Sequence, residues 1–510
     1  MEYLIIGAGS AGNVVARRLL DAGHHVTLVE AGQYDINPNI DHLNTLGLLW
    51  HSDDDWDYYT VPQPGANGRT LHVPRGKVMG GSHALNACIW VRGARQDYDN
   101  WSYNGCPGWN WDEVLPYFKK IENYDGPLNG TRSDQGLLDV CSTYPRHDLQ
   151  ESMVDAAVAA GFPLNEDYNS GDPEGVSRMQ LNIRDLHRFS TFRAYILPVK
   201  DHENLTILTQ HRVTRLLCEG TTVVGAEFLT QDGQTREIRA DATILCAGAL
   251  GSPEILLRSG IGPADELSEH GIEVVADVPG VGKNLHDHML SPVIYTTEKE
   301  ISVPEAAPAQ THLFAKSTED QLVPDTQPIF FSNPMYSQGY PGEMTGPDEA
   351  FTLMAGIVRP QSRGELKLTG ANLSDLVSLD LGVLAEQADV DALVASLKHC
   401  RSIGAQDALA KEWGAHEIWP GQDVQTDEQL EEYARNSVVT YHHQVGTCAM
   451  GESADSVTNP RTLEVYGVQG LHIADASIMP TVPTGNTNAP SIMIAERAAD
   501  MLLAQDAVDS

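Results

Sequence analysis

The sequence is poor in basic residues and in long apolar stretches, and both shortages exclude classes of protein. Only 33 Lys and Arg residues stand against 70 Asp and Glu residues, which gives a formal net charge of −37. A surface this acidic repels phosphate backbones and anionic lipids, so we expect neither a nucleic-acid partner nor a membrane partner. No segment reaches the ~20 consecutive apolar residues that a membrane span requires.

Cysteine is also scarce. The seven cysteines are widely spaced, and no two of them are separated by only two residues. An odd number at such spacing argues against a disulfide framework, a zinc knuckle or a redox CxxC pair, and favours reduced thiols. The N-terminus has no basic segment followed by an apolar run and a small-residue cleavage site. We therefore expect a cytoplasmic protein.

The composition that remains is that of a large globular protein. The chain has 510 residues, of which 41% are hydrophobic, enough for about three domains or one large discontinuous pair. Residues 301–360 contain alternating and apolar runs that predict an antiparallel sheet. The other predicted strands are 3–6, 26–29, 205–208, 213–217, 223–228 and 243–247, and the predicted helices are 10–22, 388–403 and 490–504.

The first thirty residues carry a glycine pattern with a specific chemistry. Gly7, Gly9 and Gly12 lie between a predicted strand and a predicted helix, and Glu30 closes the next strand. Such glycines permit a tight turn, close approach of the backbone to a pyrophosphate and close packing of helix on strand. A carboxylate at position 30 can bind ribose hydroxyls and disfavours NADP. FAD and NAD both remain open on this motif, and the absence of a second such motif argues against a reductase that carries both.

Five further segments resemble one family of flavoproteins. They are residues 75–93, 248–262, 278–288, 443–451 and 475–480. Each is similar to a characteristic segment of the glucose–methanol–choline (GMC) oxidoreductases, they occur in the family's order, and together with the N-terminal motif they extend over nearly the whole chain. The bacterial choline dehydrogenase-like branch is the part of the family that the sequence most resembles.

The resemblance implies an α/β flavoprotein with two domains. A Rossmann-like FAD-binding domain is expected from residues 1–155, 200–290 and 430–510. A discontinuous α+β substrate domain with an antiparallel sheet is expected from residues 156–199 and 291–429. Substrate is expected to enter between the domains, over the flavin, with a lining drawn from Phe330, Phe331, Tyr336, Trp419 and residues 50–62.

The resemblance also assigns a set of residues to FAD. Leu85 stands where some choline oxidases carry a histidine bonded covalently to FAD, so non-covalent FAD is expected. His83 is a departure from the family pattern, and a ligand, an acid or an attachment point are all open for it. The expected cofactor-binding residues are Gly7, Gly9, Ser10, Ala11, Gly12, Glu30, Ala31, Val78, Gly80, Gly81, Ser82, Asn86, Ala87, Val213, Ala247, Gly248, Asp475, Ala476 and Asn486.

For catalysis the family pattern points to His443, with Asn486 as its partner and Asn488 as the fallback. Neutral imidazole suits removal of a hydroxyl proton, because its pKa lies near working pH. The expected reaction is oxidation of a small-molecule alcohol to an aldehyde or ketone, with hydride transfer to flavin N5 and reoxidation by O2 or another acceptor. A hydroxynitrile lyase with redox-silent FAD is the alternative, and the oligomeric state stays open.

The remaining histidines and acidic residues give weaker signals. His442 replaces an aromatic residue that choline oxidases tend to have, which argues against choline and favours a small neutral or polar alcohol. Adjacent His442 and His443 point to opposite faces of an extended segment, and His286 and His288 have no evident partner cluster, so no metal site is expected. Asp53–Asp55 are read as a solvated turn.

Overall fold

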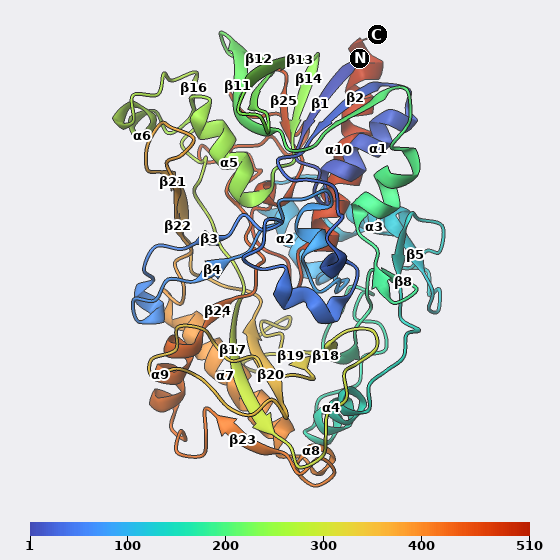
Figure 1. Cartoon of the computed structure of the whole chain (residues 1–510), viewed down its shortest axis with the longest axis vertical. Coiled ribbons are helices and arrows are strands. Elements are labelled where there is room, and N and C mark those ends of the chain that lie inside the picture. Colours follow the sequence, from blue (N-terminus) through green and yellow to red (C-terminus); the bar gives the residue numbers. More distant parts are fainter. Residues whose placement is uncertain (510) are drawn as a thin grey trace.

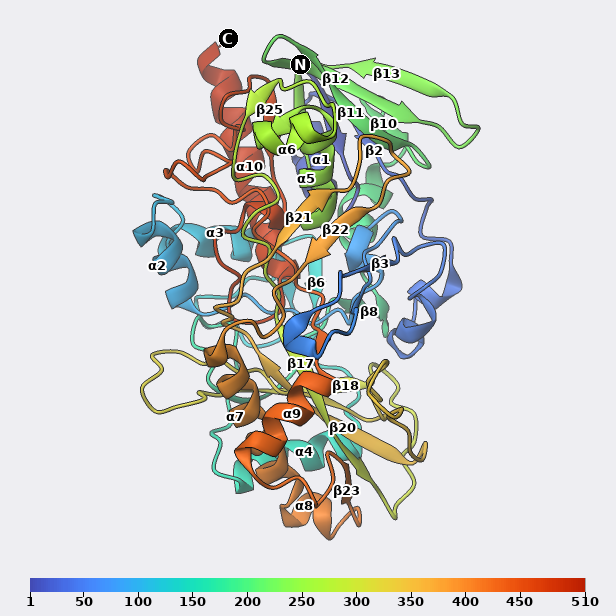
Figure 2. The same cartoon turned by 90° about the vertical axis from the view of Figure 1, so that its left-hand side faces the viewer.

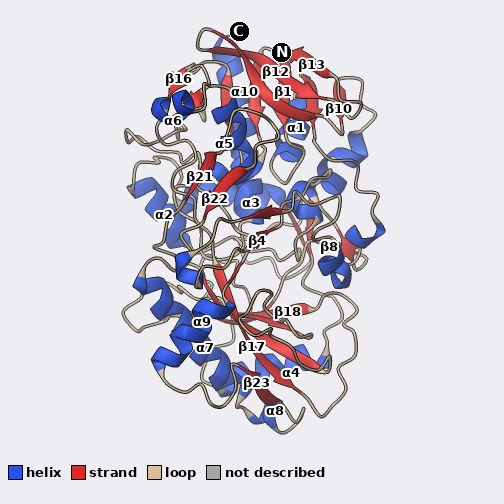
Figure 3. Cartoon of the chain, turned by 60° about the vertical axis from the view of Figure 1, so that its left-hand side comes forward, coloured by secondary structure: helices blue, strands red, loops and turns tan. Residues whose placement is uncertain are grey.

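Two β-sheets dominate the molecule, which we describe from a computed structural model covering residues 1–509, without the side chains of residues 506–509 (Figures 1 and 3). The first is a parallel five-stranded sheet in the order β10-β2-β1-β14-β25. Its strands are β1 (Glu2–Ile6), β2 (His25–Val29), β10 (Leu205–Leu208), β14 (Ala242–Leu245) and β25 (Leu471–Ile473).

The chain builds this sheet from apolar segments that are far apart in sequence. Residues 3–6 of β1 are buried, and the strand pairs with β2 on one side and β14 on the other. Helix α1 (Gly12–Asp21) buries its Val14, Val15 and Leu19 face and packs against α10 (Asn488–Asp509), the last helix of the chain. The two ends of the chain therefore lie together beside the parallel sheet, in the upper half of Figure 1.

The second sheet is antiparallel and lies in the lower half of Figure 1. Its order is β23-β17-β20-β19-β18-β7, and β24 also pairs with β17. Every residue of β20 is buried. Helix α7 (Gln387–Gly404) packs on this strand and on β17, with α9 (Asp427–Ser437) beside α7 (Figure 2). The strands are β7 (Gly175–Arg178), β17 (Met289–Thr296), β18 (Ala309–Phe314), β19 (Ile329–Phe331), β20 (Ala350–Ile357), β23 (His416–Trp419) and β24 (Val439–Thr440).

Smaller elements connect and cover the two sheets. The other helices are α2 (Arg95–Tyr103), α3 (Trp111–Ile121), α4 (Asp148–Ala159), α5 (Gly248–Arg258), α6 (Ala264–Glu269), α7 (Gln387–Gly404), α8 (Asp407–Ala410) and α9 (Asp427–Ser437). The other strands are β3 (Tyr58–Tyr59), β4 (His72–Val73), β5 (Glu122–Tyr124), β6 (Leu138–Val140), β8 (Ile183–Arg184), β9 (His187–Arg188), β11 (Arg212–Glu219), β12 (Thr222–Leu229), β13 (Thr235–Arg239), β15 (Ile261–Gly262), β16 (Ala276–Asp277), β21 (Glu365–Leu368) and β22 (Val377–Asp380).

The structure confirms the predicted class, an α/β protein with an additional antiparallel sheet, and it confirms each predicted strand and helix to within a few residues. The exact domain boundaries stay a prediction. The interpretation of Asp53–Asp55 as a solvated turn is wrong for two of the three residues, because Asp54 and Asp55 are buried. None of the described helices has the length and apolar character of a membrane span.

Candidate active site

A cavity of about 620 Å³ is lined by both halves of the molecule. The turn after β1, the end of β2 and the start of α5 line one end, which we call the nucleotide end. Strands β17, β19, β20 and β24 and the segment 335–339 line the other, which we call the substrate end. His443 and Asn486 lie on the wall of the same cavity. The cavity is thus the site to which the sequence motifs point.

The glycines of the nucleotide end hold two backbone turns in close contact. Gly7 has a φ of +101°, which side-chain-bearing residues rarely adopt. A Cβ atom at Gly12 would lie 1.8 Å from the carbonyl oxygen of Gly7, and one at Gly81 would lie 2.7 Å from the Cα of Gly9. Only glycine therefore allows α1 to start so close to β1 and the turn at residues 80–81 to reach the cavity wall.

Two buried carboxylates brace the nucleotide end. Glu30 accepts hydrogen bonds from the backbone N–H groups of Ala8 and Gly32 at 3.0 and 2.9 Å. Asp475 accepts from the N–H of Gly248 at 2.8 Å and from the Ser252 hydroxyl at 2.6 Å. Burial raises the pKa of Asp475, and raises that of Glu30 to about 7. The carboxylates fix the turns that carry them, and each still offers lone pairs toward the cavity.

These features fit a dinucleotide cofactor. Ser10 and Ala11, at the N-terminus of α1, line the cavity, as do Gly248 and Ala249 at the N-terminus of α5. Free backbone N–H groups and the helix dipole at such positions favour phosphate oxygens. The Asn488 side-chain NH2 is buried there, and none of the described residues offers it a hydrogen bond.

Most of the residues predicted to bind the cofactor line this cavity. They are Gly7, Gly9, Ser10, Ala11, Glu30, Ala31, Gly81, Ser82, Asn86, Ala87, Val213, Ala247, Gly248, Asp475, Ala476 and Asn486. Gly12, Val78 and Gly80 do not line it and lie behind the turns instead. His83 is also buried behind the wall, where its Nδ1 accepts from the N–H of Thr191 at 3.2 Å, whereas Leu85 faces the cavity.

Pairing of β24 with β17 brings two histidines together. His288 directly precedes β17, and His443 follows β24 by three residues. Their Nδ1 atoms lie 3.0 Å apart. The backbone N–H of His443 also donates to Asp287 at 2.7 Å, which fixes the backbone beside the imidazole. The sequence analysis considered His288 only as a metal ligand and missed this contact, because two segments 155 residues apart have to pair first.

The other ring nitrogen of His443 faces an amide. Nε2 lies 3.1 Å from the side-chain nitrogen of Asn486, whose oxygen accepts from Gln327 at 3.2 Å. Because the Gln327 contact orients the amide, Asn486 donates to Nε2, and the proton of the neutral imidazole is then on Nδ1, where it is donated to His288. Asn488 instead accepts from the Ser10 hydroxyl at 2.6 Å. Asn486, not Asn488, is the neighbour of His443.

Burial keeps this imidazole neutral. Desolvation lowers the pKa of His443 well below its ordinary value, and His288, His442 and Arg75 lower it further. The pKa values of His288 and His442 are themselves lowered to about 3 by burial. His443 therefore presents an unprotonated Nε2 to the cavity at neutral pH, which is the state that a general base requires.

The substrate end is lined mainly by apolar side chains. They are Leu290, Pro292, Ile329, Phe331, Met335, Tyr336, Met354, Val439 and Tyr441. Of the residues expected to line the substrate entrance, Phe331, Tyr336 and part of residues 50–62 do line the cavity. Phe330 and Trp419 do not line the cavity. Phe330 points to the opposite face of β19 and is fully buried in the core, and Trp419 packs on Tyr340.

Tyr441 is a residue that the sequence analysis missed. Its ring lies 4.4 Å from the ring of His443, centre to centre, and its hydroxyl is buried with no hydrogen-bond partner among the residues that the structure describes. Nothing in the local sequence sets this tyrosine apart from the other sixteen, because its position follows from the β24–β17 pairing.

Comparison with known proteins gives a clear result. Models of the N-terminal and C-terminal parts of the GMC oxidoreductases match residues 1–290 and 360–495. The chain belongs to the GMC oxidoreductase family. As a GMC oxidoreductase it is an FAD-dependent flavoenzyme, which separates FAD from NAD where the glycine motif could not.

Individual relatives of this GMC oxidoreductase differ in what they act on. A mitochondrial choline dehydrogenase of Mus musculus is 36% identical over 99% of this chain and 90% of its own. An alcohol dehydrogenase (acceptor) of Pseudomonas putida is 34% identical over 98% and 95% of the two chains. The crystal structure of pyridoxine 4-oxidase from Mesorbium loti superposes with a TM-score of 0.92 at 33% identity, covering 98% of both chains.

Proposed function

We propose that this enzyme oxidises an uncharged alcohol with a largely apolar or aromatic body to the aldehyde or ketone, with His443 as the general base. The observation that carries the proposal is the pair of contacts on the His443 ring, which puts the ring proton on Nδ1 and makes Nε2, beside Asn486, the basic nitrogen. Bound FAD supplies the acceptor for the hydride of the alcohol. O2 or another acceptor then completes turnover.

The protein groups around the alcohol have separate tasks. His443 Nε2 takes the hydroxyl proton, and His288 accepts the Nδ1–H and keeps the ring in that tautomer. Asn486 lies beside Nε2 and can donate to the substrate oxygen, which orients the hydroxyl without competing for its proton. The resulting imidazolium is unfavourable in so buried a place, so His443 gives up the proton to solvent, and not to the product, before the next turnover.

The charges of the cavity wall argue against a cationic substrate. Glu30, Glu254 and Asp475 are the carboxylates among the described lining residues, and all three belong to the nucleotide end. Arg75 also lines the cavity, and its guanidinium donates to the carbonyl oxygen of His442. A quaternary ammonium would meet a guanidinium and no carboxylate among the residues that line the substrate end, and Asp57 outside them is already paired with His51 and His72. The apolar lining likewise favours a larger apolar body over the small polar alcohol expected from the sequence.

The unpaired Tyr441 hydroxyl adds a specificity element. A buried hydroxyl without a partner costs free energy, and a substrate polar group that bonds to it recovers that cost. We therefore propose an alcohol with a second hydrogen-bonding group within reach of Tyr441.

The non-covalent state of FAD stays a prediction from Leu85. A cytoplasmic location stays a prediction from the seven cysteines, none of which is in a disulfide in the described residues.

An anaerobic alcohol screen tests the proposal. The holoenzyme is mixed with uncharged benzylic and heteroaromatic alcohols and, separately, with choline at the same concentrations, and loss of visible flavin absorbance is followed. Bleaching by the uncharged alcohols at higher kcat/KM than by choline is the expected result. Faster bleaching by choline would contradict the substrate class. If no alcohol bleaches a flavin that dithionite reduces, and a cyanohydrin is cleaved, the alternative lyase activity is the correct one.

A further inference from the structure

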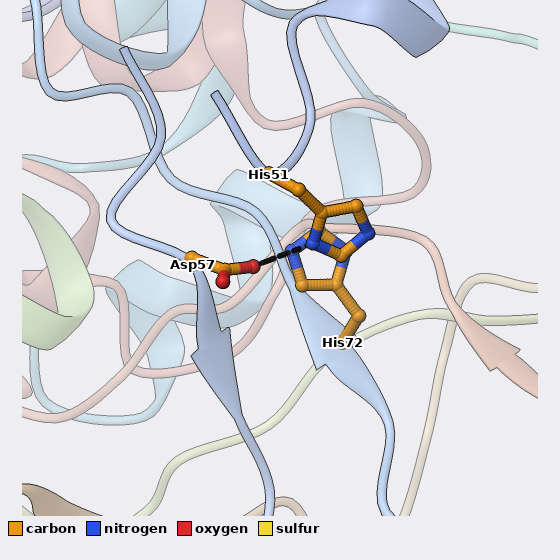
Figure 4. Close-up of side chains that lie close together, drawn as sticks. All are labelled: His51, Asp57 and His72. Atoms are coloured by element: carbon orange, nitrogen blue, oxygen red, sulfur yellow. Dashed lines mark hydrogen bonds and ion pairs between the residues drawn. The ribbon is translucent and has the colours of Figure 1, made fainter. Parts of the chain in front are cut away.

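A cluster of two histidines and an aspartate lies at the rim of the same cavity, outside the residues used above. His51 Nδ1 lies 2.6 Å and His72 Nε2 lies 3.0 Å from one carboxylate oxygen of Asp57 (Figure 4). The three ligand-type atoms all lie within 4.8 Å of one another. Two imidazole nitrogens and a carboxylate oxygen that converge in this way form a common ligand set for divalent transition metals.

The geometry of the two rings suits an ion. The imidazoles of His51 and His72 are stacked, with centres 4.0 Å apart and an angle of 29° between their planes, so that their nitrogens face Asp57 from the same side. Nε2 of His72 is buried and lies between two carboxylates, 3.0 Å from an oxygen of Asp57 and 3.3 Å from an oxygen of Asp55. A tetrahedral ion with bonds of 2.0–2.2 Å keeps its ligands about 3.3 Å apart, so small side-chain rotations would admit one.

The backbone around the cluster is held in place beforehand. Asp55 accepts hydrogen bonds from the N–H groups of His51, Asp57 and Arg75 at 3.1, 3.0 and 2.9 Å. Both His51 and Asp57 have positive φ values, 61° and 54°, which non-glycine residues adopt only where the surroundings enforce them. The buried Asp55 thus imposes the turn that brings His51 and Asp57 close to the imidazole of His72 on β4. Nothing in the acidic run of the sequence indicated this structural role.

The cluster is accessible and lies close to the catalytic groups. The side chains of His51 and Asp57 are 42% and 45% exposed, so an ion can enter from solvent. His51 and His72 both line the cavity. Trp50 packs edge-on against His72 and against His442, the neighbour of His443, with ring centres 6.2 and 5.3 Å away. An ion at the cluster would therefore stiffen the rim through which a substrate passes.

We propose that His51, Asp57 and His72 bind one Zn²⁺ ion, or a divalent transition ion of similar preference, at the mouth of the active-site cavity. The ion has three protein ligands and an open position for water. Its expected effect is reversible inhibition, because it ties the turn at His51 to the hairpin of β3 and β4 and narrows the rim. The site is independent of the reaction proposed above and of the identity of the alcohol.

Calorimetric titration of the chelator-treated, FAD-loaded enzyme with ZnCl2 tests the proposal. We expect one tight site in the wild type, and a loss of affinity of about 100-fold or more in the double variant His51→Ala/His72→Ala, since single ligand-supporting changes already cost 10–100-fold. Asp57→Asn keeps the size and hydrogen-bonding capacity of the side chain, and is expected to weaken binding as well. His416→Ala removes an exposed histidine far along the chain on β23 and serves as the matched control.

Two further measurements separate ligand loss from misfolding. FAD content and the visible flavin spectrum are expected to be the same in the three variants as in the wild type, because none of the changed residues braces the nucleotide end. Tetrahedral Co²⁺, titrated in place of Zn²⁺, is expected to give strong visible absorption in the difference spectrum of the wild type and none in the double variant. Equal Zn²⁺ affinity in the wild type and the correctly loaded double variant would overturn the proposal, and so would the absence of binding to the wild type.

Discussion

The two ends of the active-site cavity are built in different ways. The nucleotide end is made of glycine turns and helix N-termini that directly follow parallel strands, so its shape is set within short segments such as residues 6–12. The substrate end is made of single side chains from strands β17, β19, β20 and β24, which meet only through long-range pairing, such as that of Met289 in β17 with Thr440 in β24. We therefore expect the backbone to hold the cofactor in this molecule, and side chains to select and process the substrate.

The largest effect is expected at the point where the two ends meet. His443→Ala removes the base but leaves the nucleotide end intact, so kcat and kcat/KM should fall together by about 10²–10⁴-fold. FAD content is expected to stay at the wild-type level. Steady-state kinetics and the ratio of flavin to protein absorbance measure the two quantities.

Asn486→Ala is the control for this variant. It removes an orienting amide that carries no reacting proton, so it should cost less than His443→Ala. If His443→Ala retains most of the activity while loaded with FAD, the base is another residue, and His442, which also lines the cavity, becomes the first candidate.

A backbone change should show the opposite pattern. Gly12→Ala would place a methyl group 1.8 Å from the carbonyl oxygen of Gly7, so the turn between β1 and α1 has to shift. Overpacking of this kind costs about 1–3 kcal/mol, which corresponds to a loss of FAD affinity of about 5- to 150-fold if the cost falls on cofactor binding. FAD retained after gel filtration measures it. Gly47→Ala is the matched control, since nothing lies within 4 Å of a Cβ atom there. Full FAD content in Gly12→Ala would contradict the expectation that the backbone turns of the nucleotide end hold the cofactor.

The sequence predicted the nucleotide end well and the substrate end poorly. Gly7, Gly9 and Glu30 stand at fixed spacings within one β-α-β unit, and such spacings are visible in a linear chain. His288 and Tyr441 come close to His443 only through the pairing of β24 with β17. The cluster at His51 forms only through the turn that Asp55 imposes. Phe330 and Trp419 were wrongly expected in the cavity, because an apolar run does not tell which face of a strand points inward.

A moderate effect on kcat/KM is expected when the hydroxyl of Tyr441, at the substrate end, is removed. Tyr441→Phe removes one hydrogen-bonding group without changing the packing of the ring. For alcohols with a second polar group, kcat/KM should fall by about 2–10-fold, the worth of one neutral hydrogen bond. For alcohols without such a group it should stay the same. A uniform loss for both groups of alcohols would show that Tyr441 supports the structure and does not take part in selection.

The smallest effect concerns pH. Burial lowers the pKa of His443, so the neutral, active form is already complete at neutral pH and is lost only as the pH falls toward that lowered value. kcat/KM is therefore expected to be flat from about pH 7 to 9, with its acid limb below the ordinary histidine pKa of about 6.5. A rise of kcat/KM centred near pH 7 would indicate a solvent-accessible base and contradict the geometry described here.

The central claim is that this site oxidises an alcohol: His443 removes the hydroxyl proton, and the α-C–H bond of the same alcohol is broken. Anaerobic stopped-flow reduction of the flavin, with the best alcohol of the screen and with the same alcohol deuterated at the α-carbon, tests it most directly. The account predicts markedly slower bleaching with the deuterated alcohol in the wild type, and much slower bleaching with either alcohol in FAD-loaded His443→Ala. Identical rates for the two alcohols together with unimpaired reduction in His443→Ala would contradict it.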